Sequence, residues 1–316
     1  MRFFLISLFI FIFSIPIYAQ SDTTKAVVEV DSVLAADTVK YWSKTGNFRL
    51  NFRNVTLKNW NAGGSSNISL GGELRLGAIK EKEDITWTSD LLFAYGLIRE
   101  SSSDFPFKKN DDRILLNTKY SHKINDTWSL SSILNFRTQF DDGFRYRRDA
   151  NADRETRTFL STFMAPGYLQ GSLGLTLKKE EWYSVTMAPY TGKLTFVWND
   201  SLSNAGAFGV EKGEKSRLEA GSSITTSIKK TLFENVKITS LLNLFAGYES
   251  FEKVDVNWEA LLELKVNKFI TSSVSAVLIY DEDIDVKRDD GTTGPAVQFQ
   301  NVINVGFSLD LNGNGK

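Results

Sequence analysis

The chain of 316 residues contains no cysteine, one histidine and five prolines. The absence of cysteine excludes disulfides, thiolate metal sites, a cysteine nucleophile and a lipidated N-terminal cysteine. A single histidine excludes any site that needs two imidazoles. The net charge of −1 argues against nucleic acid as a partner, because nucleic-acid-binding domains carry a basic excess. Beyond the first twenty residues no run of eighteen apolar residues occurs, so the sequence predicts no membrane-spanning helix.

The first nineteen residues have the pattern of a secretory signal peptide. Arg2 is the charged residue of this stretch, an apolar run extends from Phe3 to Ile17, and Ala19 is a small residue at the expected cleavage point. The apolar run is short for a membrane-spanning helix, which needs roughly 20 residues. We therefore expect a signal peptide over residues 1–19, cleaved near Ala19. Residues 20–44 show no sustained period, and we expect them to form a flexible periplasmic segment.

From Asn47 onward the dominant period is two. Between Trp128 and Asp141 one set of alternating positions is largely apolar and the other largely polar, and the same alternation runs from Val254 to Asn267. Successive side chains of a strand point to opposite faces, so each stretch predicts a strand with one apolar and one polar face. Twelve such segments are predicted, at residues 47–58, 67–79, 85–98, 111–123, 127–141, 168–178, 182–190, 215–228, 236–248, 254–266, 270–282 and 297–310.

The lengths of these segments favour a membrane barrel over a soluble sandwich. Strands of soluble proteins cluster near about 5–6 residues, whereas a tilted membrane-spanning strand needs roughly 9–11. Short and mostly longer connections alternate along the chain, which is typical of outer-membrane barrels with short periplasmic turns. The sequence therefore predicts an all-β fold, a transmembrane antiparallel up-and-down β-barrel of about 12 strands over residues 45–311. Both termini are expected on the periplasmic side, with residues 312–316 as a tail.

Aromatic residues recur at the strand ends. Tryptophan and tyrosine favour the membrane–water interface, because one end of the ring is apolar and the other polar. Tryptophan residues placed just after short turns predict one aromatic girdle, and tyrosines at the opposite strand ends predict a second. The girdle residues are Trp87, Trp128, Trp182, Tyr95, Tyr248 and Tyr280.

Polar residues of the segments 111–123 and 127–141 share inward parity and predict a cluster in the lumen near the outer mouth. Arg113 and Arg137 are expected roughly opposite each other across the hairpin turned at Asn125, with carboxylates that pair them, because unpaired charges in a narrow lumen are costly. The cluster either binds a small polar solute or forms a network that fills the lumen, since twelve strands leave an interior narrower than a porin's. Its members are Asp111, Arg113, Asn135, Arg137, Gln139 and Asp141.

An acidic run follows the segment 270–282 and contains Asp281, Asp283 and Asp285. Calcium takes clustered oxygen ligands from such loops, but the run lacks the spacing and the fixed glycine of an EF-hand. We expect a solvated acidic rim at the outer mouth and no metal site.

His122 falls on the lipid-facing parity near a short turn, where it cannot act as a general base on a lumen substrate. The sequence therefore predicts no catalytic residue, no cofactor and no enzymatic activity.

Short stretches between Trp60 and Leu309 carry a resemblance to a known family. They are Lys109–Arg113, Phe136–Phe140, Ala165–Tyr168, Pro189–Lys193, Gly206–Val210, Tyr280–Asp283 and Val297–Phe299. In these stretches the chain resembles the Bacteroidota family catalogued as domain of unknown function 3078. The resemblance implies a location in the outer membrane of a Gram-negative bacterium, and it implies no activity. Such barrels tend to end on an aromatic residue that the barrel insertion machinery reads, whereas this chain continues past Phe307 to Lys316.

Three functions remain open from the sequence. The first is a narrow channel or transport barrel that passes small polar solutes. The second is a structural or assembly barrel with a plugged lumen, which binds a protein partner through its outer loops. The third is a hydrolase of the outer leaflet, which the position of His122 weakens. In each case the expected partners are outer-membrane lipid and the insertion machinery, and no nucleic acid.

Overall fold

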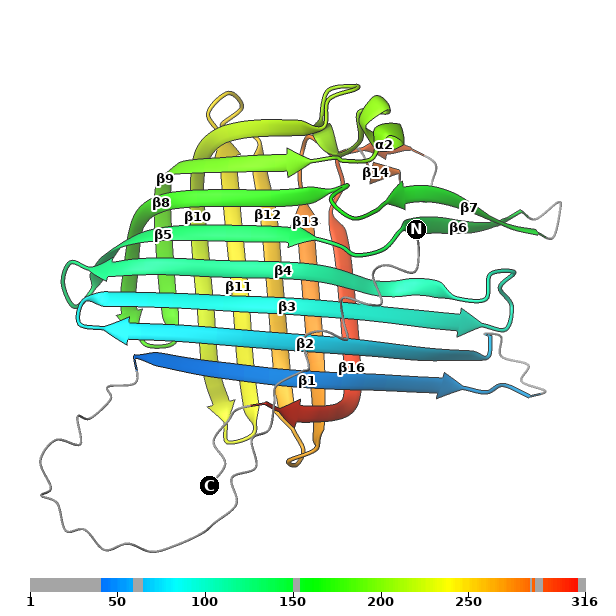
Figure 1. The fold of residues 1–316 in the computed structure, drawn as a ribbon, viewed down its shortest axis with the longest axis horizontal. Coiled ribbons are helices and arrows are strands. Elements are labelled where there is room, and N and C mark those ends of the chain that lie inside the picture. The colour runs from blue at the N-terminus through cyan, green and yellow to red at the C-terminus, as the bar shows by residue number, and fades with distance from the viewer. Residues whose placement is uncertain (1–40, 59–64, 150–153, 285, 288–291, 312–316) are drawn as a thin grey trace, which may run out of the picture. The chain divides into compact units, whose positions relative to one another are not determined.

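The protein is described by a computed structural model over residues 41–58, 65–149, 154–284, 286–287 and 292–311 (Figure 1). The predicted signal peptide with its cleavage point near Ala19, the predicted flexible segment up to residue 40, Asp285 and the predicted tail at 312–316 lie outside these residues. Within the described ranges, no helix has the length and apolar character that a transmembrane helix needs.

In the described part of the chain, twelve antiparallel strands close into a barrel, which confirms the predicted fold. Each of the twelve predicted segments overlaps one of these strands. Going round the barrel, the order is β1-β16-β13-β12-β11-β10-β9-β8-β5-β4-β3-β2. The strand bounds are β1 (Trp42–Val55), β2 (Asn67–Lys82), β3 (Ile85–Glu100), β4 (Lys108–Lys123), β5 (Trp128–Thr138), β8 (Gly167–Glu180), β9 (Tyr183–Phe196), β10 (Ser216–Phe233), β11 (Val236–Gly247), β12 (Val254–Lys265), β13 (Ile270–Tyr280) and β16 (Gln298–Asp310).

The two ends of the barrel differ in their connections. At one end, here called the short-turn end, brief turns join β2 to β3, β4 to β5, β8 to β9, β10 to β11 and β12 to β13. At the other end, here called the long-connection end, residues 139–166, 197–215 and 281–297 contain further elements. These are the hairpin of β6 (Gly143–Asp149) and β7 (Arg154–Ser161), the short helices α2 (Asp200–Asn204) and η2 (Ala207–Gly209), and the pair β14 (Val286–Lys287) and β15 (Thr293–Gly294). None of these elements is among the twelve segments predicted from the sequence, because each is too short to show a sustained period.

Strand β9 continues to Phe196, six residues beyond the predicted end at 190. The register of its pairing with β8 shifts between Leu173 and Leu175, where two residues of β9, Ala188 and Pro189, lie opposite the single residue Gly174. Proline has no N–H to donate to the ladder, so the strand bulges there and the alternation that marks it in the sequence is interrupted. A Cβ built on Gly174 would lie 2.1 Å from the Met187 carbonyl oxygen, so the close approach of β8 to this bulge requires glycine.

The alternation along the strands separates an apolar outer face from a mixed, largely polar lumen. On β5, Leu130 and Leu134 are exposed on the outside of the barrel, whereas Ser131 and Ile133 are buried on the inside. On β12, Asp255 and Leu261 are buried on the lumen face. The outer surface of the barrel therefore carries apolar side chains along the middle of its strands, and most charged side chains of the strands lie inside or at the ends.

Aromatic rings cluster outside the barrel at the short-turn end. The rings of Trp42 and Trp87 lie 5.9 Å apart, and those of Trp87 and Tyr120 lie 6.5 Å apart. The Lys80 ammonium covers the ring of Trp42. Trp182, predicted for the same girdle, lines the lumen at this end of the barrel instead, with the Lys230 ammonium over its ring. Trp128 lies at the same end, as the first residue of β5. The predicted girdle tyrosines Tyr95, Tyr248 and Tyr280 lie toward the long-connection end, and Tyr248 is 54% exposed.

Candidate functional site

The lumen contains a wide chamber of about 400 Å³ toward the short-turn end. Lys178, Glu181 and Trp182, which lie at or beside the turn between β8 and β9, contribute to its wall. Serine and threonine hydroxyls form much of the remaining wall. Charged residues that line the chamber are Arg75, Asp90, Arg113, Lys119, Lys178, Glu181, Lys229 and Glu259.

A second, narrow chamber of about 90 Å³ lies toward the long-connection end. Asp281 and Ile284, which follow β13, line it together with residues of the barrel wall. Both chambers share four lining residues, which form a waist between them: Asn117, Asn135, Leu241 and Glu259. At the waist the Asn135 Nδ2 donates to Asn117 Oδ1 at 2.6 Å. The two chambers therefore follow one another along the barrel.

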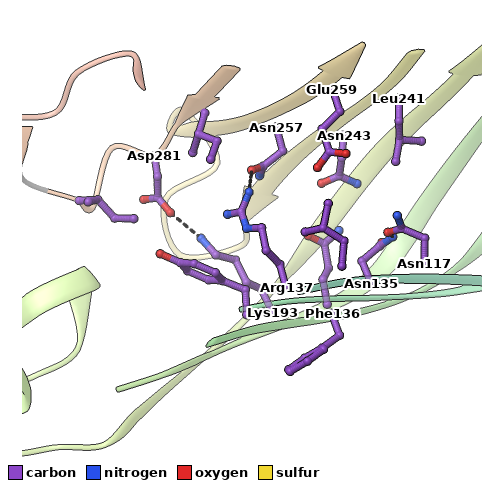
Figure 2. Close-up of a pocket in the computed structure, with 15 residues that line it drawn as sticks. Asn117, Asn135, Phe136, Arg137, Lys193, Leu241, Asn243, Asn257, Glu259 and Asp281 are labelled. Carbon is purple, nitrogen blue, oxygen red and sulfur yellow. Dashed lines mark hydrogen bonds and ion pairs between the residues drawn. The ribbon is translucent and has the colours of Figure 1, made fainter. Parts of the chain in front are cut away.

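One hydrogen bond crosses the narrow chamber from wall to wall. Arg137 on β5 donates from Nη1 to Asn257 Oδ1 on β12 at 3.0 Å (Figure 2). Four strands separate β5 from β12 on one side of the ring and six on the other, so these side chains come from opposite walls. The guanidinium also stacks over the ring of Tyr168, 4.8 Å from its centroid. Arg137 is thereby held across the lumen at its narrow end.

A buried cluster around Lys193 lies beside this crossing. The Lys193 ammonium on β9 is 2.5 Å from Asp255 Oδ2, 2.9 Å from Asp281 Oδ2 and 3.4 Å from Glu219 Oε2. Figure 2 shows the Lys193 side chain directed toward Asp281 beside the Arg137–Asn257 contact. Lys193, Asp255 and Asp281 are each less than 9% exposed. One ammonium thus meets three carboxylates that come from β10, β12 and the connection after β13.

Arg217 on β10 extends this cluster to the long connection. Its Nη2 lies 2.6 Å from Asp283 Oδ2 and 3.2 Å from Glu219 Oε1, and its Nη1 donates to the Gly209 carbonyl at 3.2 Å. Burial disfavours ionisation of Asp283, but the hydrogen bond from Arg217 and the charges of Arg217 and Lys253 outweigh it, so the pKa of Asp283 lies below its usual value. Arg217 therefore fixes the η2 segment and the connection after β13 to the barrel wall.

The predicted lumen cluster is only partly assembled. Arg113 binds Asp111 with two hydrogen bonds of 2.8 Å, and Asn135 and Arg137 line the lumen as described. Gln139 donates to the Thr162 carbonyl at 3.0 Å, so it fastens the chain beyond β5. Arg113 and Arg137 are not opposite each other, because the register places Arg137 beside Leu115. The partner of Arg137 is the amide of Asn257 and not a carboxylate, so the ion-pair network predicted around it is wrong.

Asp141 does not belong to the lumen cluster. It is exposed and accepts a hydrogen bond from the Tyr95 hydroxyl at 2.9 Å. The reason is that β5 ends at Thr138, where the Asp112 carboxylate accepts the backbone N–H groups of Phe140 and Asp141 at 2.8 and 2.9 Å. The chain turns away at that point, so strand parity no longer predicts where the side chains point.

The predicted acidic rim is also different in the structure. Asp281 is buried against Lys193 and Asp283 is paired with Arg217, so neither is a freely solvated carboxylate. Asp285 lies outside the described residues.

No group of three or more histidine, cysteine or acidic residues able to hold a metal ion occurs among the residues that the structure describes. His122 is exposed near the short-turn end of β4.

The residues that hold the narrow end were not predicted as site residues. They are Tyr168, Lys193, Arg217, Glu219, Asp255 and Asn257. Asp255 and Asn257 occupy the polar positions of a recognised alternation, so parity alone places them in the lumen. Lys193 lies beyond the bulge at Pro189, where the period is interrupted. Which of these side chains meet across the lumen depends on the stagger of all twelve strands, for which a single sequence carries no signal.

The β6–β7 hairpin, beyond the ends of β5 and β8 in Figure 1, packs against the connection between β3 and β4. The Arg157 guanidinium lies 4.3 Å from the Phe144 ring centroid and 5.3 Å from that of Phe105. Glu155 lies 2.6 Å from the Lys108 ammonium. Burial disfavours the charged form of Glu155, but the hydrogen bonds from Lys108 and Ser103 outweigh it, so its pKa lies below the usual value. The long connections thus have packed structure of their own.

A family described as "Protein of unknown function (DUF3078)" matches the chain over residues 52–144, from the end of β1 to the start of β6. This agrees with the resemblance within that stretch, and the quoted stretches after residue 144 lie beyond the match. No curated protein matches the chain.

Solved structures of similar fold include three barrels of low sequence identity. The COG4313 outer membrane channel from Pseudomonas putida F1 has a TM-score of 0.39 and 12% identity, over 87% of this chain and 100% of that one. The translocator domain of autotransporter NalP from Neisseria meningitidis has a TM-score of 0.34 and 11% identity, over 87% and 90%. OmpT, an outer membrane protein of Vibrio cholerae, has a TM-score of 0.30 and 6% identity, over 85% and 97%.

Proposed function

We propose that this protein spans the outer membrane of a Gram-negative bacterium as a narrow channel for small polar solutes. The apolar outer face of the strands and the rings at their ends match the surface that a bilayer requires of a barrel. With the orientation usual for such barrels, the short-turn end faces the periplasm and the long connections face outward. The Bacteroidota origin that the family resemblance implies belongs to the same proposal.

The observation that carries the proposal is the succession of two polar chambers along the lumen. They share Asn117, Asn135, Leu241 and Glu259 and reach from Trp182 at the short-turn end to Ile284 at the long-connection end. A barrel whose lumen served only as a packed core would be filled by interdigitated side chains, as in small barrels. Here a chamber of about 400 Å³ lies behind a waist that has two asparagine amides and a glutamate, which suits a hydrated path.

The crossing of Arg137 to Asn257 and the Lys193 cluster set the narrowest part of this path. Arg137 contacts the opposite wall through one hydrogen bond to the neutral amide of Asn257, whereas its stacking partner Tyr168 belongs to the neighbouring strand β8. Breaking this crossing contact costs little compared with breaking the Lys193 cluster. We infer that Arg137 is the movable part of the constriction and that the Lys193 cluster is its fixed wall. The small volume of this part, about 90 Å³, limits passage to small solutes.

A structural barrel that binds a protein partner at its long connections is the second candidate. It is supported by the packed core of these connections, in which Ala165, Val197, Leu202 and Val210 are buried together, and by the aromatic and arginine side chains of the β6–β7 hairpin. For this function the lumen contacts serve only to close and stabilise the barrel.

Single-channel recording in planar bilayers distinguishes the two functions. The wild-type protein should give discrete conductance steps, and Arg137→Ala should raise the step size at least about twofold, because the long side chain no longer crosses the narrowest part. Arg147→Ala, the same substitution in the exposed β6–β7 hairpin, should leave the step size unchanged. A silent bilayer with both wild type and Arg137→Ala would reject the channel and favour the structural barrel.

A further inference from the structure

Lys119 on β4 differs from the other cations of the wide chamber. Arg75, Arg113, Lys178 and Lys229 each lie within ion-pair distance of a carboxylate, whereas Lys119 forms no ion pair with any carboxylate of the described residues. Glu259 also lines this chamber, at the waist, but forms no ion pair with Lys119 among the described residues. A charge at a partly buried position without a counter-ion is costly, so Lys119 favours an anion as a ligand in this chamber.

The contact that Lys119 does make is to a row of hydroxyls. Its Nζ donates to Thr186 Oγ1 at 3.0 Å. From there hydroxyl contacts of 2.8 Å run across neighbouring strands, from Thr186 to Thr176, from Thr176 to Ser131 and from Ser131 to Ser121. Ser131, Thr176 and Thr186 are each less than 5% exposed, so the row is embedded in the barrel wall.

The direction of these hydrogen bonds follows from counting protons. A hydroxyl has a single proton to donate, and Thr176 donates its own to Ser131. Thr176 therefore accepts from Thr186, which in turn accepts from Lys119. Ser131 is buried, so its hydroxyl proton needs an acceptor, and Ser121 Oγ is that acceptor. The hydroxyl proton of Ser121 therefore remains free at the chamber wall. The Lys119 ammonium thus orients every O–H group of the row in the same direction, and hydrogen bonds arranged in such a chain strengthen one another.

We infer that Lys119 and this hydroxyl row form a binding site for a small oxyanion, such as inorganic phosphate or a carboxylate, in the wide chamber. Lys119 has two ammonium hydrogens free after its bond to Thr186, and Ser121 has one free hydroxyl proton. Lys178 lies on the same strand face as Thr176, two residues further along β8, and adds positive potential. The surroundings are thus rich in donors, and an oxyanion supplies acceptors and the missing negative charge.

This inference rests on the proposed channel, because it names the class of solute that the chamber retains. Binding and conduction are nevertheless separable. The site binds its anion in a detergent micelle, where no current flows, whereas a channel without this site would conduct and show no saturable binding. A calorimetric titration of the purified barrel with sodium phosphate therefore tests the site alone, with sodium acetate as a second probe and sodium chloride added to hold the ionic strength constant.

The wild-type protein should bind phosphate saturably with one site per chain. Lys119→Met should weaken binding at least about tenfold, since a hydrogen bond to a charged group contributes about 1.5–3 kcal/mol and about 1.4 kcal/mol corresponds to a factor of ten. Lys229→Met removes a lysine of the same chamber that already has Asp90 as its partner, and should change the affinity less than about twofold.

Folding of each variant is checked by its heat-modifiable mobility in gel electrophoresis. If Lys119→Met does not fold, Thr186→Val replaces it as the decisive variant, because it keeps the ammonium but removes the hydroxyl that positions it, and it should weaken binding several-fold. Wild-type affinity in the decisive variant, or the absence of saturable binding of phosphate and acetate to the wild type, would overturn the inference. Acetate binding without phosphate binding would support it and identify carboxylates as the ligand class.

Discussion

Replacing Lys193 with methionine should lower the free energy of unfolding of the barrel by about 3–5 kcal/mol, the cost of removing one partner from a buried ion pair. Lys193 contacts Asp255, Asp281 and Glu219, and without its ammonium these carboxylates repel one another in a wall that excludes most water. Arg217 still reaches Glu219, so part of the negative charge remains compensated. Denaturant titration of the folded barrel in detergent, followed by tryptophan fluorescence, measures the loss.

Lys178→Met is the matched control for this substitution. Lys178 also forms an ion pair, with Glu181 at 2.7 Å, but the two side chains are 50% and 92% exposed. Exposed pairs contribute about 0–1 kcal/mol, so this variant should unfold close to wild type. Equal losses for the two variants would mean that the Lys193 cluster is hydrated, and the rigid wall assigned to it in the constriction would have to be abandoned.

Leu134→Arg should destabilise the barrel by about 2–4 kcal/mol in phospholipid vesicles, which is the cost of arginine on the lipid face near the bilayer midplane. Leu134 lies near the middle of β5, points outward and is 40% exposed. Ser129→Arg places the same side chain on the same strand but into the wide chamber, which has room for it. The second variant should therefore be markedly milder in a folding titration. A larger loss for Ser129→Arg would show that the lipid and lumen faces are reversed.

Strand parity shows how much of this architecture is contained in local sequence. The alternation from Trp128 to Thr138 specifies both the strand and its two faces, because a membrane barrel exposes one face to hydrocarbon and the other to the lumen. The same rule fails at Asp141, since its side-chain direction is set by the capping of the β5 end by Asp112 and not by the strand. Parity thus predicts the lumen face within strands and nothing beyond their ends.

Contacts across the lumen lie beyond the reach of local patterns. Arg137 and Asn257 are 120 residues apart, and their meeting depends on the stagger with which twelve strands close. Lys193 is hidden for a different reason, because the bulge at Pro189 breaks the period before the strand ends. A polar lumen cluster that includes Asn135 and Arg137 could be predicted from parity, whereas the partners of these side chains across the lumen could not.

A single introduced thiol tests whether solutes pass through the chambers inside the barrel. The sequence has no cysteine, so Asn243→Cys places a unique thiol in the narrow chamber and Leu134→Cys places one on the lipid face. After treatment with a cationic methanethiosulfonate reagent, Asn243→Cys should lose at least about half of its single-channel conductance, because the adduct occupies the pore, and Leu134→Cys should be unchanged. Unchanged conductance of Asn243→Cys, with complete labelling verified by mass spectrometry, would show that solutes do not pass through the narrow chamber.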